Sequence, residues 1–252
     1  MKRNSILVIV FTVCFCTSFA FATDDAKALA EKGDAAAQFR YAEMLQTGNG
    51  FATNLTEDAV WTRKAAKQNN VEAQFRYAEM LRDGHGVAKN MKEAAKWTRK
   101  AAGAGHARAQ CQMGLFYMNG LGVDRDEDKA EEWLQKSAAQ NNVQAQYNLG
   151  LHYARTRQDR LAIKWLKEAA KEDYADAQYN LAKLYLAPNP MPAFREPGAG
   201  RYAISLLRRA AAQGHAGAKS MLNELGVDIS MSQENLQELK QVERATFINN
   251  GF

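Results

Sequence analysis

Apolar and small residues recur at helical spacing along most of this chain. In one stretch they fall at positions i, i+4, i+5 and i+8, on one face of an α-helix: Ala109, Met113, Gly114 and Tyr117. This first helix, helix A, is followed by Gly120-Leu121-Gly122, and glycine readily takes the left-handed conformation that closes a helix. Asp126 is then a good N-cap for a second helix, helix B. The pattern predicts two helices joined by a glycine turn.

The same helix pair returns at a regular interval. Residues 37–45 read AQFRYAEML, and residues 73–81 repeat them without change 36 positions later. Diverged copies begin at Ala109, Ala145 and Ala177 and a truncated one at Ala218, so that the spacings are 36, 36, 36, 32 and 41. One position of helix B is a large apolar residue in each full copy: Trp61, Trp97, Trp133, Trp165 and Leu206. The chain is therefore built from repeats.

Turns, caps and small residues follow the same register. Glycine turns recur at 48–50 and 84–86, and Asn54 and Asn90 are N-caps for the helices B that follow. A small residue at one helix A position would let helix B approach closely: Ala42, Ala78, Gly114, Gly150 and Ala182. The tryptophans are expected to fill the space between neighbouring units. Because one pair cannot bury its apolar face alone, we predict an all-α, right-handed α/α superhelical solenoid of about five to six helix-turn-helix repeats with a C-terminal capping helix.

The ends of the chain differ from the repeats. Lys2 and Arg3 precede an apolar run over residues 6–15 and then Ala20-Phe21-Ala22, so residues 1–22 are predicted to be a signal peptide cleaved after Ala22. The alternative, an uncleaved anchor, is disfavoured because the run is shorter than the roughly 20 residues of a spanning helix. We expect an N-terminal capping half-repeat over 23–34, the solenoid over 35–226, and a C-terminal capping helix and tail over 227–252. The mature protein is predicted to be periplasmic or secreted, without a membrane span.

Charge and cysteine content narrow the possible functions. Loss of Lys2 and Arg3 lowers the formal charge from +5 to +3, since the leader has no acidic residue. The basic residues recur at fixed repeat positions, interleaved with Glu and Asp, whereas a nucleic-acid binder gathers them in one patch. Cys14 and Cys16 lie in the leader, so the mature chain keeps only Cys111 and cannot form an intrachain disulfide. Neither a DNA or RNA ligand nor a lipid anchor is expected.

The repeat resembles the Sel-one-like repeat (SLR) family, a branch of the tetratricopeptide-type α-solenoids. The third copy matches the family pattern at Ala109, Met113, Gly114, Tyr117, Gly120, Gly122, Val123, Lys129, Ala130, Trp133, Lys136 and Ala138, and the resemblance spans about residues 24–226. Members act mainly as adaptors in protein complexes, including bacterial envelope regulators and factors that meet host cells. The resemblance implies a protein partner, of unknown identity, for an exported adaptor or regulator that we expect to be a monomer.

Catalytic chemistry has little support in the sequence. One cysteine-rich branch of the family is described as β-lactamase-like, so a cell-wall or β-lactam hydrolase is the alternative function; it is disfavoured because Cys111 has no companion. Cys111 could be a reactive thiol, but its apolar repeat slot favours a small buried hydrophobe. The histidines share no metal-ligand spacing and are interpreted as joint residues: His85, His106, His152 and His215. We predict no enzyme activity, cofactor or metal.

Two features exceed what packing requires and are candidates for partner binding. Helix A residues outside the A/B contact form rows that could line a concave face: Arg40, Met44, Arg76, Met80, Gln112, Phe116, Asn148 and His152. The alternative is that some of them pack on the next helix A. In the fifth repeat the turn expands to residues 187–200, which hold all four prolines together with Phe194 and Arg195. The alternatives are a tolerated insertion without a role and, for the whole chain, an architectural spacer.

Overall fold

The computed structural model describes residues 25–48, 52–187 and 198–228, and all regular structure in these ranges is helical. The chain divides into two compact units, residues 1–136 and 137–252. Unit 1 begins with a helix over residues 25–31. It continues with α2 (Ala35–Thr47), α3 (Leu55–Lys67), α4 (Val71–Asp83), α5 (Met91–Gly103), α6 (Ala107–Asn119) and α7 (Glu127–Ala138), whose end crosses the border. Unit 2 contains α8 (Val143–Arg155), α9 (Asp159–Lys171), α10 (Ala175–Tyr185), α11 (Ala199–Ala212) and α12 (Ala216–Glu224).

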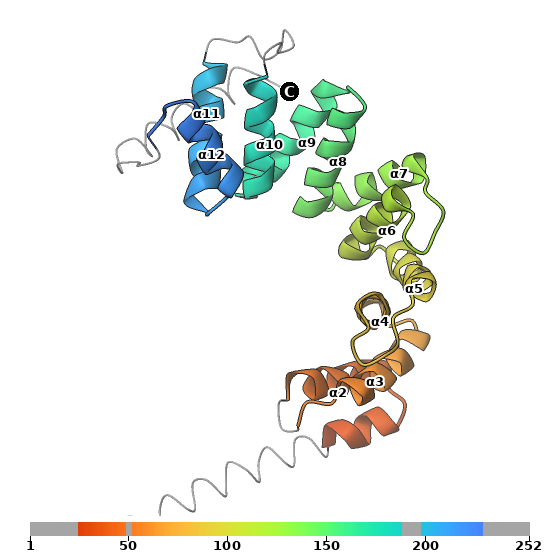
Figure 1. The fold of residues 1–252 in the computed structure, drawn as a ribbon. Helices are drawn as coiled ribbons and strands as arrows, with labels where there is room; N and C mark the ends of the chain where they lie inside the picture. Colours follow the sequence, from red (N-terminus) through yellow and green to blue (C-terminus); the bar gives the residue numbers. More distant parts are fainter. Residues whose placement is uncertain (1–24, 49–51, 188–197, 229–252) are drawn as a thin grey trace, which may run out of the picture. The chain divides into compact units, whose positions relative to one another are not determined.

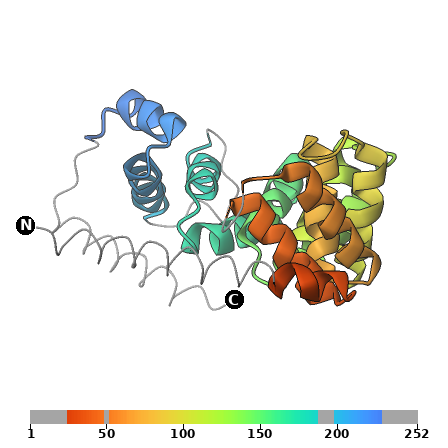
Figure 2. The same cartoon turned by 90° about the horizontal axis from the view of Figure 1, so that it is seen from below.

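The helices of each unit pack in chain order as pairs. Within a repeat α2 packs on α3 and α4 on α5 in unit 1, and α8 on α9 and α10 on α11 in unit 2. Between repeats α3 packs on α4, α5 on α6, α9 on α10 and α11 on α12. Figures 1 and 2 show this succession of helices in unit 1 from two directions, with α2 to α6 packed in chain order. The predicted all-α array of paired helices is confirmed.

Side chains cap the helices where the sequence predicts their starts. Asn54 accepts a hydrogen bond from the backbone N–H of Glu57, Asn90 from that of Glu93, and Asp126 from that of Lys129. These bonds satisfy backbone donors that the first turn of a helix leaves without a partner. Three helices A end at a left-handed glycine: Gly48, Gly84 and Gly120. The repeated caps and turns define where each helix begins and ends through local interactions that do not depend on packing.

Close approach of the two helices explains the small residues. A Cβ added to Gly114 would lie 2.7 Å from Leu134 Cγ of α7, and one added to Gly150 would lie 2.7 Å from Leu166 Cγ of α9. Contacts this short do not occur between carbon atoms, so any larger residue at either position would force the leucine or the facing helix to move. The predicted close A/B approach is confirmed, and the side chain met there is the leucine that follows the tryptophan.

The tryptophans join a repeat to its neighbour. Trp97 meets Tyr77 of its own pair edge to face, with 5.6 Å between ring centroids, an arrangement favoured by aromatic quadrupoles. It belongs to the same buried cluster as Ala59 and Ala66 of the preceding repeat. Trp61 packs in the same way on Tyr41, in a cluster that includes Ala30 of the first helix. Trp133 and Trp165 are only half-buried.

The glutamine of the recurring Ala-Gln motif ties four of the helices A to the helix that precedes each of them. Its Nε2 donates to a backbone carbonyl eight residues earlier: Gln38 to Ala30, Gln74 to Ala66, Gln110 to Ala102 and Gln178 to Ala170. The distances lie between 3.1 and 3.3 Å, and all four glutamines are buried. Each bond satisfies a carbonyl at a helix end, where intrahelical partners run out.

Several predicted segments lie outside the described residues. These are the signal peptide over 1–22, most of the C-terminal segment 227–252, and the part of the proline-rich turn that contains Phe194 and Arg195. Of the helices in the described ranges, none combines the length and apolar character that a membrane crossing requires.

Candidate functional site

A pocket of about 400 Å³ lies at the joint between the first two repeats, within unit 1. Gln46 near the end of α2 and Leu55 at the start of α3 line it. The other lining residues come from α3, α4 and the turn after α4: Asp58, Arg76, Glu79, Met80, Asp83 and His85. The pocket lies where three segments meet: the end of α2, the start of α3, and α4 of the next repeat. Its lining is charged, with Leu55 and Met80 as apolar surfaces.

A buried ion pair forms one wall of this pocket. Nη2 of Arg76 donates to Oδ2 of Asp58 at 2.7 Å, and Oγ1 of Thr62 donates to Oδ1 of the same carboxylate at 2.9 Å. The Asp58 side chain is fully buried and that of Arg76 is 15% exposed. Burial raises the pKa of Asp58 above its usual value, and the charge of Arg76 and the two hydrogen bonds offset part of this rise. Arg76 is therefore held in one position by a carboxylate that cannot reach water.

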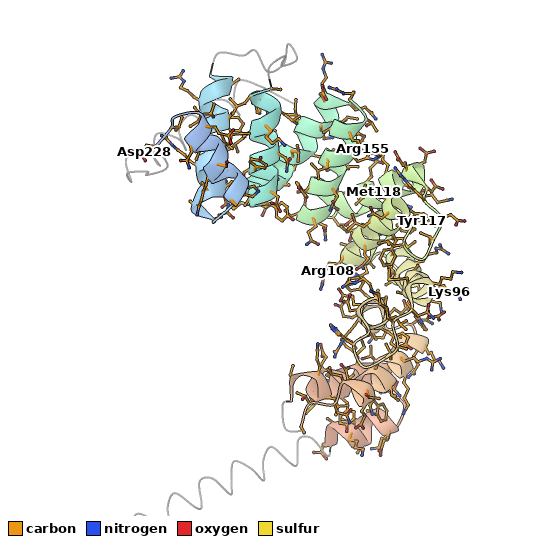
Figure 3. The ribbon with its side chains drawn as sticks, in the orientation of Figure 1. Lys96, Arg108, Tyr117, Met118, Arg155 and Asp228 are labelled. Atoms are coloured by element: carbon orange, nitrogen blue, oxygen red, sulfur yellow. The ribbon has the colours of Figure 1, made fainter. Side chains whose placement is uncertain are left out.

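Two further carboxylates, Glu79 and Asp83, are four residues apart on one face of α4. Arg82 donates to both oxygens of Asp83, at 2.8 and 2.7 Å, and these bonds lower the pKa of Asp83. Oε1 of Glu79 lies 3.8 Å from Arg82 and 3.7 Å from Arg108. Arg108, labelled in Figure 3, is exposed on α6. Neither arginine lines the pocket, so the charged groups on its partly exposed rim are Glu79, Asp83 and the imidazole of His85.

The candidate row residues differ in how far they reach solvent. Arg40 is exposed, and Met44, Gln112 and Asn148 are half-buried. Met80 and Phe116 are buried because they pack into the clusters of successive repeats, and His152 is buried beside Tyr153. These three side chains pack against neighbouring helices, as the alternative interpretation of the rows predicts. Met80 also lines the pocket. Of the candidate partner-binding residues in the described ranges, Arg76 and Met80 are the two that line the pocket.

Asp58 was not among the candidates, although the sequence contains a signal for it. The equivalent helix B position is alanine in the other four full repeats: Ala94, Ala130, Ala162 and Ala203. An acid in a position that is otherwise a buried alanine needs a partner, since an unpaired buried charge is costly. Its partner, Arg76, lies 18 residues later on another helix.

The thiol and histidine side chains have structural surroundings. Cys111 is buried, and burial raises its pKa to about 11, as the hydrophobe interpretation predicts. His106 and His215 cap α6 and α12 through Nδ1, 3.0 Å from the backbone N–H groups of Ala109 and Ala218. Each ring stacks on an aromatic residue of the preceding repeat. In the described part of the chain, no group of three or more His, Cys, Asp or Glu residues could hold a metal ion.

Comparison with solved structures identifies proteins of the same fold. A Sel1 repeat protein from Oxalobacter formigenes is similar with a TM-score of 0.68 and 24% identity, over 89% of this chain and 99% of that one. A protective antigen of uropathogenic Escherichia coli with an SLR fold is similar with a TM-score of 0.66 and 23% identity, over 84% of this chain. This chain spans 54% of the E. coli protein. The comparison with curated proteins found no match.

The repeat units also match a known family pattern. The Sel1 repeat matches residues 35–70, 71–106, 107–142, 143–174 and 175–215, well over half of the chain. Each matched segment contains a helix A and the helix B that follows it. The chain is a member of the Sel1 repeat family.

Proposed function

We propose that the protein is an exported scaffold that binds another protein, as an adaptor or regulator of the bacterial envelope or of a host-contact process. The observation that supports this most is the pocket in unit 1, an open, charged recess on an array of packed helices. A recess of this kind can accept a side chain of a partner without rearrangement of the array. Binding on a rigid surface avoids much of the entropy cost of ordering an interface.

Catalysis is not part of the proposal. A hydrolase of the β-lactam or cell-wall type needs an activated nucleophile beside a base. Cys111 is buried with a raised pKa, so its thiol stays protonated and out of reach of a substrate at neutral pH. The histidines at 106 and 215 use Nδ1 to cap helices. Turnover of nitrocefin or muropeptides that is lost on changing one pocket residue would overturn the proposal.

Partner capture tests the binding function. The tagged mature chain, residues 23–252, is incubated with envelope extract of the source organism, in parallel with an Arg40→Ala, Gln112→Ala variant. We expect one dominant captured protein that is reduced with this variant. The matched control is Arg63→Ala, Lys96→Ala, which removes two exposed side chains from helices B. Equal capture by all three chains would place binding elsewhere, and no capture would contradict the proposed function.

Export is tested separately. We propose cleavage after Ala22, which would give a mature protein that begins at Thr23. N-terminal sequencing of the protein from a periplasmic or culture fraction should read Thr-Asp-Asp-Ala. Recovery of the full chain in the membrane fraction would contradict cleavage and favour an uncleaved anchor.

A further inference from the structure

We propose that the pocket between the first two repeats receives a basic side chain, Lys or Arg, of the partner; this rests on the proposed function, in which the partner is a protein. The pocket is lined by three carboxylates, one guanidinium and one imidazole: Asp58, Glu79, Asp83, Arg76 and His85. Arg76 is already paired with Asp58. Glu79 and Asp83 are therefore the lining carboxylates not paired with Arg76, and their present partners, Arg82 and Arg108, lie outside the pocket lining.

The existing partners of these two carboxylates leave room for another cation. Arg82 contacts both from the same helix, but its pairs lie at a partly exposed surface, where such pairs contribute little to stability. The second contact of Glu79 is Arg108, whose side chain is 63% exposed. A carboxylate accepts several hydrogen bonds, so a partner's ammonium or guanidinium can be added on the pocket side.

The size and the apolar surfaces of the pocket fit a long basic side chain. A volume of 400 Å³ falls at the small end of the range of ligand pockets, which is about 300 to 1,000 Å³. Leu55 is 44% exposed at the pocket, and Met80 lines the same recess. Lys and Arg lay their methylene stems along apolar surface and keep the charged end in a polar environment. Leu55 and Met80 would contact the stem, and the two acids the charge.

The three acids at this joint are not part of the general repeat pattern. One repeat later the positions of Glu79 and Asp83 hold Leu115 and Asn119, and that of Asp58 holds Ala94. The helix pair therefore folds without these acids elsewhere in the same chain. Asp58 holds Arg76 against the wall, which keeps the guanidinium from reaching the rim acids and neutralising them. The buried pair thus keeps one more guanidinium away from Glu79 and Asp83, whose other partners are the arginines outside the pocket lining.

Amide NMR of the mature chain tests the site without the natural partner. The probes are N-acetyl-arginine amide and N-acetyl-lysine amide, with the citrulline and norleucine amides as uncharged counterparts of similar length. We expect the two cations to shift amide signals of residues 55–58 and 76–86, and the uncharged probes to shift them at least about tenfold less at equal concentration. Glu79→Gln with Asp83→Asn should abolish the shifts. The matched control, Asp124→Asn with Glu132→Gln, makes the same charge change outside the pocket and should leave them intact.

Other outcomes separate this inference from the function on which it rests. Equal shifts by citrulline and arginine amides, or shifts that survive the Glu79→Gln, Asp83→Asn change, would overturn the basic-side-chain site. So would stronger perturbation by Ca²⁺ alone, or a concentration-dependent dimer abolished by the same two changes. If a partner is captured while the arginine probe leaves the pocket signals unmoved, the inference fails and the scaffold function stands. If the probe binds as expected but no partner is captured, the site stands and the proposed function fails.

Discussion

Arg76 on α4 reaches back to Asp58 on α3 and pairs with it at 2.7 Å, where the Asp58 side chain has no contact with water. This pair joins the first repeat to the second through the wall of the pocket. The other repeats place alanine at the position of Asp58, so the ion pair is an addition to the common packing of the repeat. A buried pair of this kind is destabilising when only one partner is removed, and much less so when both are replaced together.

Removal of Arg76 alone should therefore be far more costly than removal of the pair. We expect Arg76→Gln to lower the free energy of unfolding by about 3 kcal/mol, because Asp58 would be left buried without a counter-charge. The double variant Asp58→Ala, Arg76→Gln copies the residues that the next repeat has at these positions, Ala94 and Gln112. The double variant should recover more than half of the free energy of unfolding that Arg76→Gln loses. Urea unfolding followed by circular dichroism measures both variants, and a double variant no more stable than Arg76→Gln would contradict the coupling.

The same carboxylate should make stability depend on pH. The pKa of Asp58 is raised in the folded protein from 3.8, so the folded state keeps its proton to a higher pH than the unfolded chain does. The contribution of Asp58 is then largest at acidic pH and declines as the pH rises from about 3.8 through the raised pKa. The Asp58→Ala, Arg76→Gln variant should lack this decline. Its Tm relative to the wild type should rise between about pH 4 and pH 7.

Asp83 provides a control of opposite sign for the pH experiment. Arg82 lowers the pKa of Asp83, so its contribution to stability is present above the unfolded pKa and is lost as the pH falls. Asp83→Asn should therefore destabilise the protein at neutral pH and have less effect in acid. The same pH trend for the Asp58 and Asp83 variants would contradict the assigned shifts.

Cys111 should react only when the protein unfolds. With a pKa of about 11, roughly one thiol in a thousand is ionised at pH 8, and the side chain is buried as well. Alkylation of the folded mature chain by iodoacetamide, followed by mass spectrometry, should be at least about 100-fold slower than in urea. The unfolded chain is the control, because its one thiol is then exposed. Rapid labelling of the folded chain would instead indicate an accessible, activated cysteine.

A single substitution in unit 2 should stabilise it. Oε1 of the buried Gln146 has no hydrogen-bond partner among the described residues. In two other repeats the equivalent oxygen accepts from a glutamine at the C-cap of helix B, Gln68 to Gln38 at 2.8 Å and Gln213 to Gln178 at 3.0 Å. The C-cap of α9 is Glu172, which has no amide N–H group to donate to Gln146 as the glutamines do.

We therefore expect Glu172→Gln to raise the free energy of unfolding by about 1 kcal/mol, through one new buried hydrogen bond. Thermal unfolding followed by circular dichroism measures the change. The matched control is the same substitution in a Gln146→Met background, where there is no oxygen to satisfy and the gain should vanish. An equal gain in both backgrounds would indicate that removal of the negative charge, and not the hydrogen bond, is responsible.

Local features of the structure could be predicted from the sequence because their causes lie within a few residues. Asn54, Asn90 and Asp126 cap the helices that they precede, and Gly84 ends a helix in a left-handed conformation. The close approach at Gly114 also follows from the repeat, since a small residue recurs at that position. The caps and the turn depend on local backbone conformation. The close approach depends on side-chain size, which comparison of the repeats shows to be small at that position in every full copy.

Side-chain orientation could be predicted only in part. Helical spacing placed Arg40, Met80 and Phe116 on related positions of helix A, but a period does not say how far each position turns toward the next helix. In the structure Arg40 is exposed, while Met80 and Phe116 belong to the clusters of successive repeats. The difference arises because burial depends on the neighbour's side chains as well as on the residue's own position.

The sequence by itself determined the repeat, its helix pairs and the caps that bound them, because nine identical residues and a recurrent tryptophan establish the register. It also marked Asp58 as an exception among alanines. Only the tertiary structure showed that Arg76 is the partner of Asp58 and that the pair lines a pocket. The physical reason is that a repeat fixes what neighbouring copies share, whereas a pocket arises from residues that differ between copies and meet only when the helices pack.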